Sequence, residues 1–195
     1  MTVEDPRPER ADAARNRRAI LDAAGKLLAE RGANNVSIEE IAAAAGVGKG
    51  TVFHRFGSRV GLLRELVMER AESLRSAVAS GEPPLGPGAP ARERLLAFFA
   101  AWADFTIENF ELYAAYSTDI DDDPRAEEFH AFWCGHIAAL LGETRPGIVD
   151  ADVQARLLFF GTFASPVSFQ LFRAGEGPRL KAAALAIVDA VASSP

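Results

Sequence analysis

The sequence predicts an all-α fold of about nine helices. Apolar residues recur at helical spacing through most of the 195 residues, and no segment shows the alternation or the β-branched content of a strand. The segment SGEPPLGPGAP at 80–90 holds four prolines and three glycines, a content that no helix tolerates. We therefore expect an N-terminal helical module, a connection at 80–90, and a C-terminal helical module.

Stop and start signals separate the N-terminal helices. An apolar stripe in RNRRAILDAAGKLLAERG predicts a first helix that ends at Gly32. Ser37 begins the second helix, and Glu40 stands three residues later, as in a capping box. Gly46 ends this helix. A third helix is expected over 48–56, and a fourth begins at Ser58.

Five further helices are expected in the C-terminal module. Their starts are indicated by polar caps, by prolines in the first turn and by renewed apolar stripes, and they lie near Ala91, Asn109, Asp123, Asp150 and Pro178. Pro166 falls inside the long helix expected over 150–173. Proline removes a backbone hydrogen bond, so we expect it to kink that helix.

Composition bounds the class of protein. The chain is 49% hydrophobic and 25% charged, which is typical of a globular protein. Its single cysteine cannot form an intrachain disulfide, the charged N-terminal segment does not resemble a secretory signal, and no apolar window is long enough for a membrane span. We therefore expect a cytoplasmic protein without a membrane partner.

Charge is distributed unevenly. The net charge is −6, but residues 1–60 hold ten basic and eight acidic residues, whereas the remainder holds 11 basic and 19 acidic residues. A mildly basic N-terminal module on an acidic body could face a polyanion by itself. Chance variation of surface charge would give the same numbers, so motifs must decide.

The stretch AGVGKGTVFHRFGSR at 45–59 suggests two opposed functions. GVGKGT resembles a phosphate-binding loop, but that loop needs Ser or Thr where Gly50 stands and a glycine where Ala43 stands. It also follows a strand, and the residues before this stretch are helical in pattern. The sequence therefore argues against nucleotide hydrolysis here.

The same stretch fits a helix-turn-helix, with a glycine turn at Gly46 between two short helices. Val52 and Phe56 lie four residues apart and would bury one side of the second helix, leaving a polar start and outer face for DNA. The N-terminal residues of such a helix meet base edges, and helix N-termini suit phosphates. The predicted DNA-contacting residues are Ser37, Lys49, Gly50, Thr51, Phe53, His54, Arg55, Ser58 and Arg59.

Over residues 14–74 the sequence resembles the DNA-binding domain of the TetR (tetracycline-repressor) family of bacterial transcription regulators, with the helix-turn-helix at 37–56. The resemblance is carried by ILDAA, by SIEEIAAAAGV, and by KGTVFHRF followed by GSR. It departs from the family at Gly48, where Ser or Thr is frequent, at Phe53, where Tyr is common, and at Arg59, where Lys is usual.

The resemblance implies a homodimer that binds a palindromic operator in double-stranded DNA and joins through its last two helices. It also implies a C-terminal domain at 75–195 that binds a small-molecule effector. Residues 1–13 would be a flexible basic arm, which could enter a minor groove or simply be a disordered tail. The predicted function is a ligand-responsive repressor.

The C-terminal half is rich in aromatic residues, and most of them must form a core. A subset could line an apolar pocket with a few polar groups, which predicts an apolar or aromatic effector. The candidates are Trp102, Phe105, Thr106, Phe132, His136, Phe163 and Gln170. Each of these residues could instead pack in the core without contacting a ligand.

The sequence gives little indication of a catalytic site or a metal site. His130 and Cys134 share one helical face, but two ligands four residues apart are not a metal site without partners. No motif indicates a catalytic residue or a cofactor, so we expect no enzyme. A helical small-molecule-binding protein that no longer binds DNA specifically remains the alternative.

Overall fold

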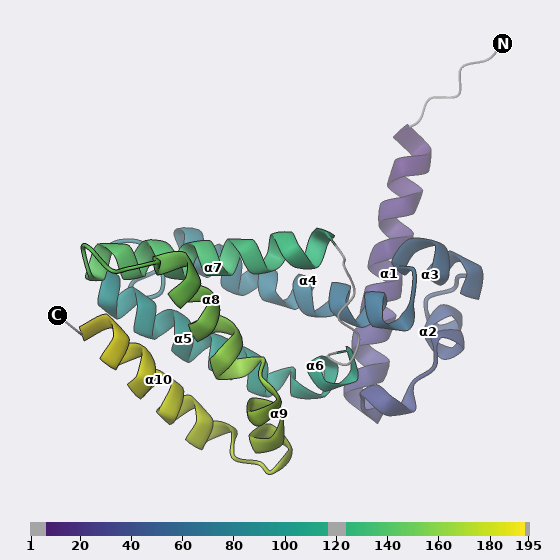
Figure 1. Cartoon of the computed structure of the whole chain (residues 1–195). Coiled ribbons are helices and arrows are strands. Elements are labelled where there is room, and N and C mark those ends of the chain that lie inside the picture. Colours follow the sequence, from purple (N-terminus) through teal and green to yellow (C-terminus); the bar gives the residue numbers. More distant parts are fainter. Residues whose placement is uncertain (1–6, 117–123, 194–195) are drawn as a thin grey trace. The chain divides into compact units, whose positions relative to one another are not determined.

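The computed structural model describes residues 7–116 and 124–193, and its described residues form helices and no strand (Figure 1). The predicted all-α class is confirmed. None of the helices described here is long and apolar enough to cross a membrane. The helices are α1 (Arg7–Arg31), the 3-10 helix η1 (Ala33–Asn35), α2 (Ile38–Ala44), α3 (Lys49–Phe56), α4 (Arg59–Ser80), α5 (Ala91–Glu108), α6 (Phe110–Tyr116), α7 (Pro124–Thr144), α8 (Ala151–Phe163), α9 (Pro166–Arg173) and α10 (Gly177–Ser193).

The described chain forms two compact units. Residues up to Glu69, together with Glu111–Tyr116, form the first unit, and Arg70–Phe110 with the residues from Pro124 onward form the second. The boundary therefore lies inside α4. The proline-rich segment at 80–90, expected to connect the modules, belongs to the second unit. Apolar residues along the whole of α4 explain this, because its first half has Leu62 and Leu66 to bury and its second half has Val78.

The first helix is longer than expected. α1 begins at Arg7, so residues 7–13, expected as part of a flexible arm, are helical. Residues 1–6 lie outside the described part of the chain. The segment is rich in Ala, Arg and Glu, which have high helix propensity, and Pro8 stands in the first turn, where proline is tolerated.

The first unit is built around one buried stripe from each helix. Ile20, Ala24 and Leu28 of α1 and Ile38 and Ile41 of α2 are all buried, and the two helices pack against each other. The predicted capping box at the start of α2 is present: Ser37 Oγ accepts from Glu40 N–H at 3.2 Å, and Ser37 N–H donates to Glu40 Oε2 at 2.9 Å. The cap fixes where α2 begins.

α3 and α4 meet at a corner that needs a glycine. A Cβ built on Gly61, in the first turn of α4, would lie far inside van der Waals contact with the carbonyl oxygen of Phe56, the last residue of α3. That oxygen belongs to the backbone and cannot rotate away. Gly61 is therefore required by the fold, a role that the sequence pattern did not indicate.

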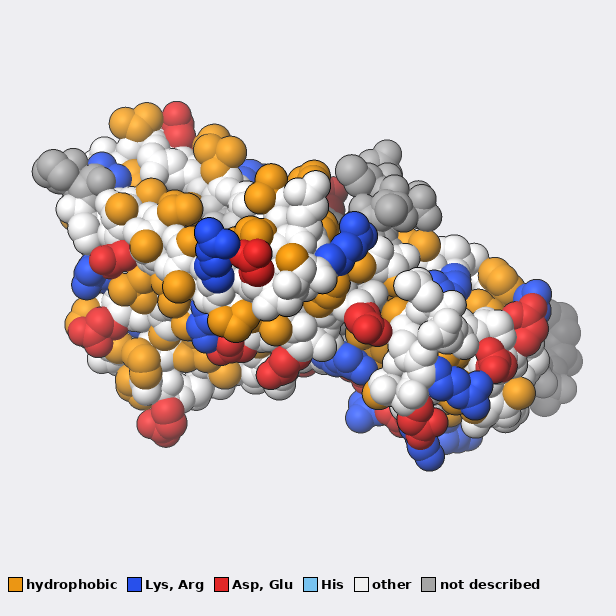
Figure 2. Space-filling view, turned by 90° about the horizontal axis from the view of Figure 1, so that it is seen from below, with side chains coloured by type: hydrophobic (Ala, Val, Ile, Leu, Met, Phe, Trp, Pro, Cys, Tyr) orange, Lys and Arg blue, Asp and Glu red, His pale blue; other side chains and the backbone are white. Residues whose placement is uncertain are grey.

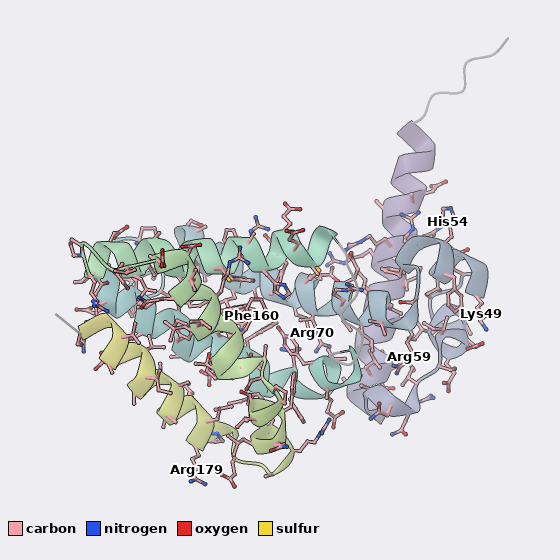
Figure 3. All side chains as sticks on the ribbon, in the orientation of Figure 1. Lys49, His54, Arg59, Arg70, Phe160 and Arg179 are labelled. Atoms are coloured by element: carbon pink, nitrogen blue, oxygen red, sulfur yellow. The ribbon has the colours of Figure 1, made fainter. Side chains whose placement is uncertain are left out.

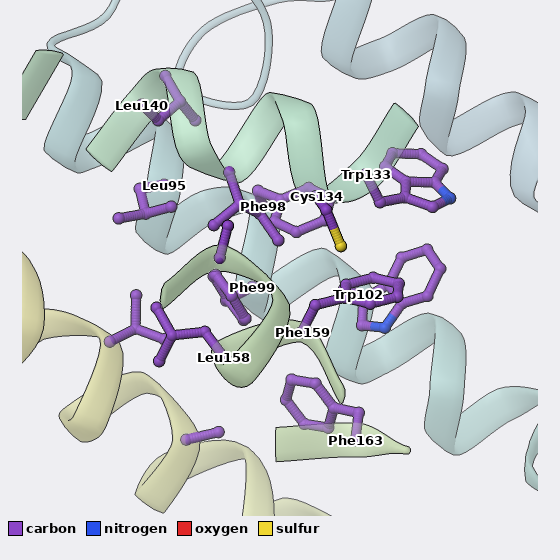
Figure 4. Packing of buried hydrophobic residues seen from close by; sticks show 14 of the residues in the cluster. Leu95, Phe98, Phe99, Trp102, Trp133, Cys134, Leu140, Leu158, Phe159 and Phe163 are labelled. Atoms are coloured by element: carbon purple, nitrogen blue, oxygen red, sulfur yellow. The ribbon is translucent and has the colours of Figure 1, made fainter. Parts of the chain in front are cut away.

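The second unit has an aromatic core (Figure 4). Phe98 packs against Trp133 with ring centroids 5.6 Å apart, and Trp102 lies 5.1 Å from Trp133 and 4.9 Å from Phe159. These residues come from α5, α7 and α8 and are almost completely buried. The centre of this unit is therefore filled by large rings.

The long helix expected over 150–173 is two helices. α8 ends at Phe163, and α9 begins at Pro166 with Ser165 as its N-cap, whose side chain accepts from Ser168 N–H at 3.2 Å. Ser168 Oγ in turn donates to the carbonyl oxygen of Thr162 at 2.7 Å. The expectation of one kinked helix was wrong because Ser165 and Pro166 form a complete helix start.

Candidate nucleic-acid interface

Two short helices and a tight turn form the centre of the candidate interface. α2 and α3 are joined through Gly46, whose φ of 69° is a conformation that favours glycine, and Val47 N–H donates to the carbonyl oxygen of Ala42 at 3.0 Å. Val52 and Phe56 of α3 are buried, as predicted. Because one side of α3 is fixed in the core, its other side must face away from it.

The outward side of α3 carries the predicted contact residues. Phe53 is 41% exposed, which makes it a surface residue rather than a core aromatic. Lys49, Gly50 and His54 are exposed too, and Figure 3 shows Lys49 and His54 at the outer edge of this unit. The structure therefore brings four predicted residues onto one surface of a single helix.

Lys49 has two partners within the chain. Its Nζ forms an ion pair with Glu39 Oε1 of α2 and lies 5.5 Å from the centroid of the Phe53 ring. The hydrogen bond from Lys49 holds the pKa of Glu39 below its ordinary value. Sequence reasoning missed Glu39, because a contact between residues on two different helices leaves no periodic signal.

The start of α3 is unusually open. Gly48 is its N-cap and provides no side-chain hydrogen bond. A Cβ built on Gly50 would meet nothing within 4 Å, so the fold itself does not require a glycine there. The free space and the uncapped N–H groups leave room for an external acceptor close to the backbone.

Three of the predicted contacts, Ser37, Ser58 and Arg59, form hydrogen bonds within the protein. Ser37 caps α2, and Ser58 Oγ accepts from Gly61 N–H at 3.0 Å at the start of α4. Arg59 Nη2 donates to the carbonyl oxygen of Ala33 and, at 3.4 Å, to that of Val36. Arg59, predicted to contact DNA, thus also holds the turn in front of α2.

Thr51 and Arg55 are half-buried, so they reach the outer surface less fully than Lys49 does. The Nε of Arg55 is buried without a hydrogen bond. Charge on the surface of the first unit is mixed: Figure 2 shows Lys and Arg beside Asp and Glu on the part formed by this unit, at the right of the view. Salt bridges such as Arg31–Glu40, at 2.8 Å, account for part of this mixture.

The seven candidate ligand residues lie in different surroundings. Trp102, Thr106 and Phe163 are buried, and Phe105 and Phe132 pack partly buried against the same core. The hydroxyl of Thr106 donates to the carbonyl oxygen of Trp102 at 2.8 Å, so its hydrogen is used within α5. Gln170 is exposed on α9 and does not join the others.

His136 is the only ionisable side chain among the seven, and its surroundings perturb it strongly. Burial, followed by the positive charge of Arg94, lowers its pKa to about 4. Its ring meets Phe98 edge-on at 5.4 Å between centroids, and its Nε2 is buried without a hydrogen bond. His136 is therefore a neutral, mostly apolar-packed side chain at neutral pH.

A groove of about 600 Å³ lies elsewhere, between α5 and α10. Its floor is apolar, its acidic residues are Glu93 and Asp189, and it contains none of the seven candidates. Among the described residues no three His, Cys, Asp or Glu side chains gather in a way that could hold a metal ion.

The chain matches known regulators in sequence and fold. Residues 20–66 match the model of bacterial regulatory proteins of the tetR family. The chain is 30% identical over 164 residues to the HTH-type transcriptional repressor LfrR of Mycolicibacterium smegmatis. This match covers 70% of this chain and 86% of LfrR. The chain is 32% identical over 108 residues to the HTH-type transcriptional regulator BetI of Brucella anthropi, which covers 52% and 51%.

A solved structure shares the fold. FadR of Thermus thermophilus, a TetR-family transcriptional repressor in complex with lauroyl-CoA, superposes with a TM-score of 0.70 at 23% identity. The match covers 90% of this chain and 92% of that one.

Proposed function

Because the chain belongs to the tetR family of bacterial regulatory proteins, we propose that it is a ligand-responsive repressor that binds a palindromic operator as a homodimer. Its relatives are transcriptional regulators rather than enzymes. The observation that carries the proposal is the division of α3, which buries Val52 and Phe56 and exposes Lys49, Phe53 and His54. Such a helix can enter a major groove without disturbing its own core.

The predicted contacts divide into two kinds. Lys49 at the start of α3 would donate to guanine O6 and N7 or to a phosphate, and Gly50 would let the backbone approach a base edge. Thr51, His54 and Arg55 would contact phosphates or bases. Ser37, Ser58 and Arg59 would contact phosphates, and the Phe53 ring would pack against the sugar-phosphate backbone. Phosphate contacts position the protein, so the sequence preference would come mainly from the first turn of α3.

The proposed dimer is supported by an unusual surface on the second unit. Val153, Leu157 and Phe160 are exposed on α8 and are spaced four and three residues apart, as on one helical face. Val167 of α9 and Ile187 of α10 are exposed as well. Exposed large apolar residues on each of the last three helices suit a second copy of this chain.

The proposed effector is a small apolar or aromatic molecule bound in the second unit. The aromatic richness of this unit supports the proposal, and the relative from Thermus thermophilus was solved with lauroyl-CoA. Effector binding would release the operator if the effector has higher affinity for a conformation that does not fit DNA. Phe105, Phe132 and His136 are the candidates with partly exposed side chains.

Binding to the DNA upstream of the chain's own gene tests the proposal. We expect sequence-specific binding that weakens steeply with salt. Lys49→Ala should lower that affinity by about 5- to 150-fold, the range for one good base contact. Lys26→Ala, which removes an exposed lysine of α1, is the matched control and should have little effect.

Two results would contradict the proposal. Unchanged affinity of Lys49→Ala would mean that α3 is not the reading helix. Absence of any DNA binding by the wild type at low salt would favour the alternative, a small-molecule-binding protein that has lost DNA recognition. The uncapped Gly48 and the missing hydroxyl at Phe53 are the features that would explain such a loss.

A further inference from the structure

We propose that Glu39 is a specificity-determining residue, which directs Lys49 toward the neutral acceptors of base edges and away from phosphates. The proposal rests on the proposed function. It starts from the ion pair between Glu39 of α2 and Lys49 of α3, which joins the two helices at the surface predicted to face DNA.

The ion pair is accessible to an incoming duplex. The side chains of Lys49 and Glu39 are 53% and 59% exposed. The Phe53 ring lies beneath the ammonium group, at 5.5 Å from Nζ to the ring centroid, and adds a cation–π contact on that side. The fold therefore presents Lys49 with an anion already beside it.

A lysine ammonium has three N–H donors, so Lys49 can keep Glu39 and still donate to a further acceptor. The charge of that acceptor decides how much electrostatic repulsion from Glu39 the contact must overcome. Guanine O6 and N7 are neutral, and they can share the ammonium with a carboxylate. A phosphate is an anion, and its approach to Lys49 places it beside the carboxylate of Glu39, where like charges repel.

This difference separates two modes of DNA binding. Binding to any sequence depends on cations that neutralise phosphates, and each one adds close to one unit to the salt slope. With Glu39 beside it, Lys49 contributes little to that binding. At an operator with a guanine in reach, Lys49 gains a base contact without losing Glu39.

Substitution of Glu39 by Gln tests the inference. The side chain is exposed, so the fold should persist. Affinity is measured by fluorescence anisotropy for a random-sequence duplex and for the upstream DNA, between about 50 and 200 mM salt. We expect Glu39→Gln to raise affinity for the random duplex about fivefold at low salt and to steepen its salt slope by about one.

Glu39→Gln should raise affinity for the upstream DNA by about twofold or less. The ratio of affinity for the upstream DNA to affinity for the random-sequence duplex should therefore fall. Glu30→Gln is the matched control, because it makes the same change of charge at an exposed position of α1. A second comparison uses a Lys49→Gln background. There, Glu39→Gln should have no larger effect than Glu30→Gln, since Glu39 is inferred to act through Lys49.

The outcomes separate the inference from the proposed function. If the wild type binds neither duplex at low salt, the proposed function fails and the role of Glu39 fails with it. If the wild type binds the upstream DNA but Glu39→Gln behaves as Glu30→Gln does, only the inference is overturned. Equal gains on both duplexes, or a gain that persists without Lys49, would also overturn it.

Discussion

Leu157 offers a direct test of the proposed dimer surface. It lies on α8 between Val153 and Phe160 and is 68% exposed. A leucine that is so exposed gains little from the fold of its own chain. If a second copy covers this face, Leu157→Ala should weaken association while it leaves the folded monomer almost unchanged.

The size of the effect follows from the exposed fraction. Complete burial of a leucine side chain is worth about 1.5–3 kcal/mol, so covering the exposed part of Leu157 is worth about 1–2 kcal/mol in each copy. A symmetric dimer contains the residue twice, so Leu157→Ala should weaken the free energy of dimerisation by about 2–4 kcal/mol. The dissociation constant should then rise by roughly 30- to 700-fold.

Sedimentation velocity over a range of protein concentrations measures this constant. Phe53→Ala is the control, because it removes an exposed large apolar side chain from α3, outside the proposed dimer surface. Far-ultraviolet circular dichroism should show that both variants keep their helices. A Leu157→Ala protein that dimerises as tightly as the wild type would refute the assignment of this face, and so would a wild type that stays monomeric.

Two further predictions concern stability, each measured by urea unfolding followed by circular dichroism. Gly61→Ala should lower the free energy of unfolding by about 1–3 kcal/mol, because the new Cβ would meet the backbone oxygen of Phe56. Gly50→Ala is the control and should not lower it, because open space surrounds that position. The pKa of His136 is lowered in the folded state, so the unfolded chain binds its proton more readily and stability should fall as pH drops from about 6.5 toward 4. His136→Gln should reduce this pH dependence, while the same change at the exposed His54 should leave it in place; equal slopes in all three proteins would contradict the reasoning.

Features with a local cause could be predicted from the sequence. The cap at Ser37 depends on residues within one turn, and the buried positions Val52 and Phe56 follow from helical periodicity. Ser165 followed by Pro166 is also a local helix start, and the expectation of a kink gave the proline too much weight and the serine too little. That information was present in the sequence.

Contacts between helices could not be predicted in the same way. Glu39 meets Lys49 across two helices, and Arg59 meets the carbonyl oxygens of Ala33 and Val36, 26 and 23 residues earlier. Such pairs depend on how the helices pack, which periodicity does not specify. For the same reason composition could not tell that Trp102 lies inside the core while Gln170 lies on the surface.

The two helices of the candidate interface differ in how their first turns are held. Ser37 closes the start of α2, whereas α3 starts at Gly48 without any side-chain cap and continues through a second glycine at Gly50. Glycine has the largest conformational entropy to lose, so this turn is the least costly part of α3 to unwind. If a phosphate of the duplex supplies the missing acceptor, binding DNA also stabilises the first turn of α3. The free-energy cost of ordering this turn would then reduce the affinity for DNA. A serine at position 48 could cap the turn in the free protein and so lower that cost.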